Sequence, residues 1–210
     1  YSQTNKVVSA ARNLGIEKAQ GEFICFLDGD DLFTENSLLK RIEVFKQFPK
    51  VDFVDGSISV QNETLDQTFY IRNPTYEGPP LKDLLLLTGH SFLGPTWLIK
   101  RSTISNFRFN QELSHGEDLM FYISIADGHY YSYCDYVIMI YRKRSGSAMS
   151  KIKPLLNFYS YYLVYVKENY EGTLLSKNEY KNIKKKVKRI AIRSTLKKGF
   201  FLKTVKWIFK

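Results

Sequence analysis

The feature that most constrains this sequence is an apolar segment that ends in three carboxylates, Glu22–Asp31 (EFICFLDGDD). Its residues Phe23–Leu27 are aromatic, β-branched or otherwise apolar, which is typical of a strand buried on both faces. Carboxylates gain nothing at the end of such a strand unless they face a cleft, and open α/β sheets bind ligands beyond the carboxyl ends of their strands. The segment therefore predicts an α/β sheet with helices on both faces and a binding site at its acidic end.

The acidic end suits a divalent metal ion. Asp28 and Asp30 flank Gly29, so the backbone can turn there and come close to a ligand. Crowded carboxylate oxygens favour Mg²⁺ or Mn²⁺, usually shared with the phosphates of a substrate. The plainer alternative is an Asp-Gly turn that caps the next helix. The apolar strand before the motif and Asp31 behind it favour the metal–diphosphate interpretation.

The remaining elements follow from periodicity and turn residues. We expect helices over 9–19, 34–49, 81–88 and 117–126, strands over 51–60, 94–100, 130–134 and 137–142, and a surface loop over 67–80. In the second helix Thr34 is the expected N-cap. Its expected apolar face consists of Leu38, Leu39, Ile42, Phe45 and Phe48. Trp97 is expected in the core, at the centre of a strand, and the alternative is that its aromatic face stacks on a sugar ring.

Three segments in order carry a family resemblance. Residues 8–31 (VSAARNLGIEKAQGEFICFLDGDD) resemble the central motif of family-two glycosyltransferases, the GT-A type with a DxD signature. Residues 115–121 (HGEDLMF) resemble that family's second motif, an acidic pair that opens a helix, and residues 140–150 (IYRKRSGSAMS) resemble the strand and Gly-Ser loop that follow it. The resemblance implies a GT-A (Rossmann-like) nucleotide-diphospho-sugar transferase sheet. Family members begin with a βαβ half that grips the nucleoside, and we expect that on the order of 60–90 residues of this half are missing here.

The resemblance also implies roles for the acidic residues. Asp28 and Asp30 would hold the metal ion, which neutralises the charge of the leaving nucleoside diphosphate, with Asp30 in direct contact. Asp118 would be the base that takes the proton of the acceptor hydroxyl, giving inversion at the anomeric carbon. Glu117 would orient Asp118 or contact acceptor hydroxyls. The alternative for this pair is that acids in a first helical turn stabilise the helix dipole.

Basic residues complete the predicted site. The family places a basic residue near the donor at the position of Arg12, which is otherwise a surface arginine of a helix. Arg142, with Lys143 and Arg144, precedes a Ser-Gly-Ser loop that would close over the diphosphate. Solvated charges at a strand end are the alternative. His115 is a metal ligand, an acceptor contact or simply a polar loop residue.

Charge divides the chain into two predicted domains. Residues 1–150 hold 15 Lys/Arg against 18 Asp/Glu, whereas residues 151–210 hold 16 Lys/Arg against 3 Glu. We expect a glycosyltransferase domain over 1–150 and a basic, aromatic-rich helical extension over 151–210. A basic amphipathic helix over 181–198, followed by the apolar and lysine-rich end of the chain, is typical of docking to an anionic membrane surface. A helix packed on the domain is the alternative, and nucleic acid is disfavoured because the acidic first 150 residues continue no basic surface.

The resemblance implies an enzyme that moves a sugar from a nucleotide-sugar donor to a glycan or lipid-linked acceptor hydroxyl, inverting and metal-dependent, and with the basic extension it implies cell-surface polysaccharide biosynthesis. The alternative is a non-catalytic, truncated module that docks to a membrane or partner through its basic extension. Cys25 and Cys134 lie in apolar contexts that indicate thiols of a reducing compartment. The sequence contains no uninterrupted run of about 18 apolar residues, so it does not indicate a membrane-spanning helix. We therefore expect a cytoplasmic protein, peripheral on the inner face of the plasma membrane.

Overall fold

The computed structural model describes residues 7–144 and 152–196. The chain forms two compact units. The sheet unit consists of Tyr1–Glu112 and Glu117–Ser145, and the helical unit consists of Leu113–Gly116 and Gly146–Lys210.

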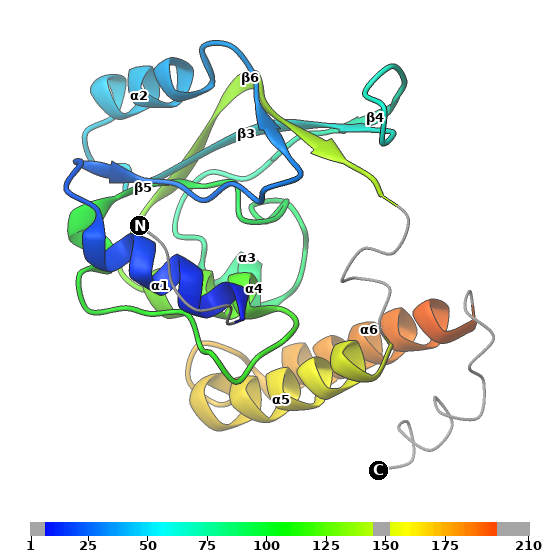
Figure 1. Cartoon of the computed structure of the whole chain (residues 1–210). Helices are drawn as coiled ribbons and strands as arrows, with labels where there is room; N and C mark the ends of the chain where they lie inside the picture. The colour runs from blue at the N-terminus through cyan, green and yellow to red at the C-terminus, as the bar shows by residue number, and fades with distance from the viewer. Residues whose placement is uncertain (1–6, 145–151, 197–210) are drawn as a thin grey trace. The chain divides into compact units, whose positions relative to one another are not determined.

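The sheet unit is a mixed α/β structure with helices on both faces of a curled sheet, as the sequence predicts (Figure 1). Its strands are β1 (Phe23–Ile24), β2 (Leu32–Phe33), β3 (Phe53–Gln61), β4 (Thr68–Arg72), β5 (Leu98–Lys100) and β6 (Tyr131–Arg142). Its helices are α1 (Val8–Lys18), α2 (Ser37–Gln47), α3 (Leu81–Leu85) and α4 (Glu117–Ile125), with a 3-10 turn at Arg101–Ile104. The strand order is β1-β5-β3-β6-β2, and β4 pairs with β3 beside that path.

The strand before the acidic turn differs from its prediction. β1 holds two residues, it pairs antiparallel with β5, and it ends the described sheet. Within the described sheet the only parallel pairing joins β3 and β6. Leu27 is 42% exposed, so the run is not buried on both faces. An apolar composition indicates burial, but it does not distinguish an inner strand from an edge strand.

Helix α2 presents a different face to the sheet than the one predicted. Leu38, Leu39 and Phe48 are exposed, whereas Arg41 is fully buried. The guanidinium of Arg41 donates to the carbonyl oxygens of Ser37 (3.1 Å) and Thr96 (2.9 Å). Because these bonds satisfy the charge inside the core, the buried face runs through Ser37, Arg41 and Phe45. Thr34 is not a cap either, since its hydroxyl donates to the carbonyl of Val137.

Two further predictions about strands were wrong. The predicted loop over 67–80 contains β4, whose five residues are all exposed. The two strands predicted over 130–134 and 137–142 form the single strand β6. Its register against β3 shifts near Gly56, where a Cβ atom would lie 2.5 Å from a methyl carbon of Ile138. This shift lets β6 continue through residues 135 and 136, where the sequence predicted a break between two strands.

An aromatic stack links α4 to the sheet. Trp97 is fully buried, which confirms its predicted place in the core, although it precedes β5. Its ring stacks on Tyr122 of α4 at 4.1 Å and on Phe53 of β3 at 4.9 Å. The stack fixes the depth at which α4 packs. The two cysteines are free thiols, of which Cys134 is buried and Cys25 is partly buried.

The helical unit contains α5 (Ile152–Tyr170) and α6 (Lys177–Leu196), which lie side by side in Figure 1. The periodicity of segment 158–166 is compatible with either a helix or a strand, and the structure shows a helix there. Helix α6 confirms the predicted basic helix and begins four residues earlier. No helix in the described part of the chain is both long and apolar enough to span a bilayer. The predicted Ser-Gly-Ser loop and the apolar end of the chain lie outside the described residues.

Candidate active site

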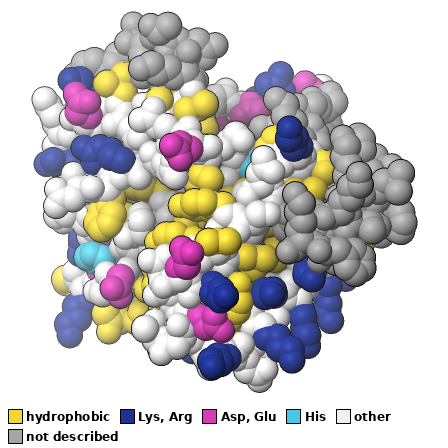
Figure 2. All heavy atoms as spheres, turned by 90° about the horizontal axis from the view of Figure 1, so that it is seen from below, with side chains coloured by type: hydrophobic (Ala, Val, Ile, Leu, Met, Phe, Trp, Pro, Cys, Tyr) yellow, Lys and Arg dark blue, Asp and Glu magenta, His cyan; other side chains and the backbone are white. Residues whose placement is uncertain are grey.

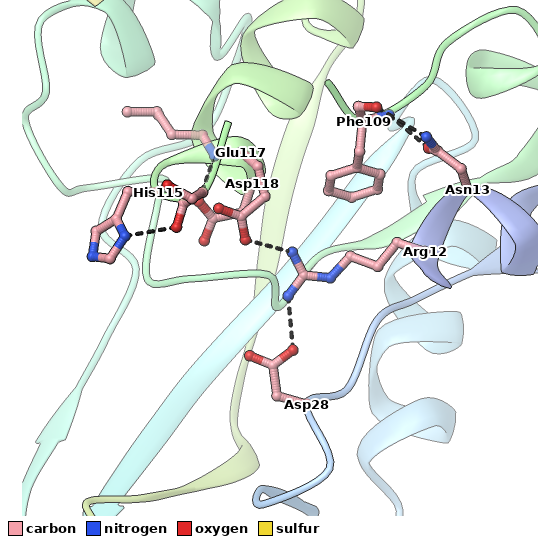
Figure 3. A network of polar contacts seen from close by, with 9 residues as sticks. Arg12, Asn13, Asp28, Phe109, His115, Glu117 and Asp118 are labelled. Atoms are coloured by element: carbon pink, nitrogen blue, oxygen red, sulfur yellow. Dashed lines mark hydrogen bonds and ion pairs between the residues drawn. The ribbon is translucent and has the colours of Figure 1, made fainter. Parts of the chain in front are cut away.

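One arginine joins two of the predicted acidic segments. Arg12 of α1 donates from Nη2 to Asp28 Oδ1 (2.7 Å) and from Nη1 to Glu117 Oε1 (3.0 Å), as Figure 3 shows. Asp28 follows β1, and Glu117 is the first residue of α4. Burial of the guanidinium opposes its charge, but the two carboxylates outweigh this effect and the pKa of Arg12 is raised. The structure thus brings together three predicted site residues from three elements.

The neighbours of Arg12 hold it in this position. The side-chain amide of Asn13 donates to the carbonyl oxygen of Phe109 (2.9 Å) and accepts from its N–H (2.7 Å), which ties α1 to the loop before α4. The ring of Phe109 lies 5.3 Å from the guanidinium carbon of Arg12 and stacks on Phe121 of α4 at 4.0 Å. Sequence reasoning missed Asn13 and Phe109. The Arg-Asn pair stands inside the recognised motif, but no sequence signal indicated its partner 96 residues away.

The carboxylates of the acidic turn have different environments. The side chains of Asp28 and Asp30 are 43% and 44% exposed. Asp31 is 7% exposed, and its Oδ1 accepts from the backbone N–H of Arg142 (2.9 Å). Desolvation by burial raises the pKa of Asp31 to about 6. Asp31 is therefore an anchor between the turn and the end of β6, and it leaves Asp28 and Asp30 open to a ligand.

Arg142, at the end of β6, and Arg144, two residues later, lie near this anchor. Arg144 is 3.9 Å from Asp30 Oδ2 and 3.4 Å from Glu63 Oε1, both long contacts between exposed groups. Arg142 supplies its backbone N–H to Asp31, and its Nε is buried without a hydrogen-bond partner among the described residues. Arg142 is thus next to the acidic turn but outside the ion-pair cluster around Arg12.

Asp118 follows the paired Glu117 in the first turn of α4. Part of the residue is exposed, yet protein atoms surround its carboxyl group. Desolvation, followed by the charge of Glu117, raises the pKa of Asp118 to about 6. A carboxyl group with this pKa is mostly ionised at pH 7 and is a stronger base than an ordinary aspartate, as a general base requires.

The residues before Glu117 explain part of the second motif. Gly116 has a φ of 66°, and a Cβ atom there would overlap the ring of Phe158. Glycine is therefore required at this position on two counts. His115 is 6% exposed. Its Nδ1 lies 2.7 Å from the carbonyl oxygen of Ser114, and its Nε2 has no partner in the described part of the chain. His115 is not a member of the ion-pair cluster.

The acidic turn fits a metal ion that is shared with a ligand. Among residues 7–144 and 152–196, no three His, Cys, Asp or Glu side chains lie close enough to hold a metal ion by themselves. Mg²⁺ sites that include substrate phosphates need only one or two protein carboxylates, because water and phosphate oxygens complete the coordination. Asp28 and Asp30 meet that requirement. Since Arg12 already neutralises Asp28, Asp30 is the carboxylate with more uncompensated charge.

A groove leads to these residues. Its volume is about 590 Å³, and it runs between α1 and the segment from Phe23 to Gly29. This volume is within the range of small-molecule sites. Arg12 and Asp28 lie in its lining, together with Gly15 and Gly29, which have no side chain to fill it. The ion-pair cluster therefore borders a space large enough for a ligand.

Comparison with known proteins points to one family. Residues 1–108 match the model of glycosyl transferase family 2. An uncharacterized glycosyltransferase of Haemophilus influenzae is 32% identical over 123 residues, which is 59% of this chain and 46% of that protein. An uncharacterized glycosyltransferase of Methanocaldococcus jannaschii is 22% identical over 155 residues, which is 73% of this chain and 53% of that protein. The chain thus spans about half the length of these relatives.

A solved structure has the same fold. Residues 1–349 of Staphylococcus aureus TarS, in complex with UDP-GlcNAc, superpose with a TM-score of 0.60 at 18% sequence identity. The alignment covers 90% of this chain and 54% of that one. This likeness confirms the predicted GT-A type of sheet.

The ion pairs of Arg12 differ in burial, and this difference is measurable. We expect a double-mutant cycle with Arg12→Met and Glu117→Gln to give a coupling of about 1–3 kcal/mol in the free energy of unfolding, since both side chains are largely buried. The cycle with Asp28→Asn should give less than about 1 kcal/mol because Asp28 is half exposed. Urea denaturation measures both. Equal couplings, or none for Glu117, would contradict the arrangement.

Proposed function

Because the chain belongs to glycosyl transferase family 2, we propose that it moves a sugar from a nucleotide-sugar donor to a hydroxyl group of a glycan or lipid-linked acceptor. One observation carries this proposal: Arg12 ties Asp28, at the exposed acidic turn, to Glu117, which precedes the raised-pKa carboxyl group of Asp118. The carboxylate of the acidic turn, which suits a metal-bound diphosphate, and the carboxyl group of Asp118, which suits a general base, are thereby held in one site. The UDP-GlcNAc bound to TarS supports a donor of this class.

The donor would lie against the acidic turn. Asp28 and Asp30 would hold Mn²⁺ or Mg²⁺, which supplies a Lewis acid for the charge of the leaving diphosphate. Arg12 keeps the Asp28 carboxylate in place and adds a fixed positive charge at the groove. Arg142, which is next to the turn, would contact the donor phosphates. This assignment gives every exposed carboxylate of the turn a partner in the bound state.

Asp118 would act on the acceptor. As the acceptor oxygen bonds to the anomeric carbon, the bond from that carbon to the diphosphate oxygen breaks and Asp118 takes the hydroxyl proton. Attack opposite to the leaving group inverts the anomeric centre. Glu117 is fixed by Arg12 and would orient Asp118 and the acceptor. The family model ends before these two residues, so this assignment is supported by their geometry and by the motif.

The setting of the reaction is also a proposal. Transfer to a glycan or lipid-linked acceptor fits cell-surface polysaccharide biosynthesis on the cytoplasmic side of a membrane. A non-catalytic docking module is the second candidate, because α6 exposes the basic side chains Lys181, Lys185, Arg189 and Arg193. Such a module would bind no nucleotide, and the following experiment distinguishes the two functions.

Nucleotide binding tests the acidic turn. We expect titration with UDP, GDP, CDP and dTDP to detect binding of one base, with an affinity that falls at least about tenfold when Mn²⁺ is omitted. The Asp30→Asn variant should lose this metal dependence. Asp127→Asn is the matched control, since Asp127 is an exposed aspartate of the same unit. Binding that is independent of Mn²⁺ and of Asp30 would refute the metal assignment, and no binding at all would favour the docking module.

Substitution of the base separates chemistry from binding. We expect Asp118→Asn to lower the rate of nucleoside diphosphate release from the matching nucleotide sugar by about 10²–10⁴-fold and to leave donor affinity unchanged. Glu112→Gln, an exposed acid before α4, is the control.

The pH dependence of the unsubstituted protein follows from the same residue. The pKa of Asp118 is about 6, and only the ionised form accepts a proton. We therefore expect kcat/KM to be level above pH 7 and to fall about tenfold per unit below pH 6. A profile without an acid limb, or an Asp118→Asn variant that remains active, would remove Asp118 as the base.

A further inference from the structure

Helix α6 carries a row of positive charges that winds slowly around the helix. Lysine or arginine recurs at every fourth residue, at positions Lys177, Lys181, Lys185, Arg189 and Arg193. With 3.6 residues per turn and a rise of 1.5 Å per residue, each step of four residues advances about 40° around the helix, so these side chains follow a strip about 24 Å long that winds through about 160°. All five are exposed. We call them the cationic row.

Within the part of the chain that the structure describes, the cationic row has no acidic partners. In residues 7–144 and 152–196 none of the five forms an ion pair with an aspartate or glutamate. The one acidic residue of α6 is Glu179, which accepts from the N–H and the hydroxyl of Ser176 at the start of the helix (both 2.8 Å). A row without counter-charges repels itself, so an anionic partner would stabilise it.

Packing fixes the direction in which the row points. Ile183, Val187, Ala191 and Thr195, also spaced by four, are buried. Ala191 forms an apolar cluster with Ile152 and Leu156 of α5. Rotation of α6 would expose this buried stripe, so the cationic row stays on the outside of the helical unit. In Figure 2 one group of Lys and Arg side chains lies at the lower right of the view, beside hydrophobic ones.

We propose that the cationic row binds the anionic phospholipids of a membrane surface. Exposed lysine and arginine side chains spread along about 24 Å of one helix can reach a charged surface at several points, and each one near such a surface adds to the attraction. A nucleic acid would require basic surface beyond α6, whereas residues 1–150 carry three more acidic than basic residues. The sequence that follows the described residues adds phenylalanine, tryptophan and lysine (GFFLKTVKWIFK), a composition suited to the interface of a bilayer.

This docking would hold the protein at a membrane surface. It goes beyond the proposed sugar transfer and does not depend on it, because binding to a membrane requires neither donor nor acceptor. The vesicle experiment can therefore fail while nucleotide binding succeeds, and the reverse.

The test is flotation of the full chain with vesicles of phosphatidylcholine, with and without phosphatidylglycerol. We expect binding only to the vesicles that contain phosphatidylglycerol, and we expect it to weaken in high salt. The variant K181Q/K185Q/R189Q/R193Q should lower the partition coefficient about tenfold or more.

Two control variants keep the result interpretable. K18Q/K40Q/K46Q/K50Q removes four charges from the sheet unit and should bind like the unsubstituted chain. K181R/K185R/R189K/R193K alters the same row, keeps its charge and should also bind. The proposal is overturned if vesicles with phosphatidylglycerol are not bound or if both neutralised variants lose binding equally. It is also overturned if a DNA duplex binds through the row while the vesicles do not.

Discussion

The site depends on one constraint: the largely buried guanidinium of Arg12 must be neutralised where it lies. A buried cation is tolerated only with partners at hydrogen-bonding distance, and Arg12 takes one carboxylate from the acidic turn and one from the start of α4. Three segments that are far apart in the sequence are therefore fixed relative to one another. Two further contacts hold the same segments together. Asn13 exchanges two hydrogen bonds with the backbone of Phe109, and the ring of Phe109 stacks on Phe121.

Around this arginine, environment gives five acidic residues of similar chemistry different tasks. Asp28 and Asp30 remain exposed and suit a ligand, whereas Asp31 is buried on a backbone N–H and holds the turn to β6. Glu117 is neutralised by Arg12, and Asp118 is left unpaired by any cation at contact distance in the described residues, with a pKa raised by desolvation. Burial, hydrogen bonding and ion pairing are what distinguish these carboxyl groups. The proposed division of labour has the same origin.

Local patterns in the sequence predicted the elements better than their packing. The motifs at 28–31 and 115–118 were recognised because their chemistry is written in adjacent residues, and the structure confirms a helix that opens at Glu117. The face of α2 was wrong because periodicity reads apolar side chains and Arg41 is buried through hydrogen bonds. Strand β4 was read as loop because the turn-forming residues that follow it, Pro74, Gly78, Pro79 and Pro80, decided the interpretation of the whole stretch 67–80. The pairing of Asn13 with Phe109 joins residues whose separation no local pattern reports. Motif residues were thus accessible to sequence reasoning, and the contacts that position them were not.

The central claim is that the exposed carboxylates beside Arg12 receive a metal-bound nucleoside diphosphate. Anomalous diffraction at the manganese edge, from crystals grown with Mn²⁺ and the nucleoside diphosphate that binds, tests it most directly. We predict one manganese peak at coordination distance, about 2.2 Å, from a carboxylate oxygen of Asp30 or Asp28, with the diphosphate on its other side. A diphosphate bound without manganese at this turn, or a manganese peak at another cluster of side chains, would contradict the account.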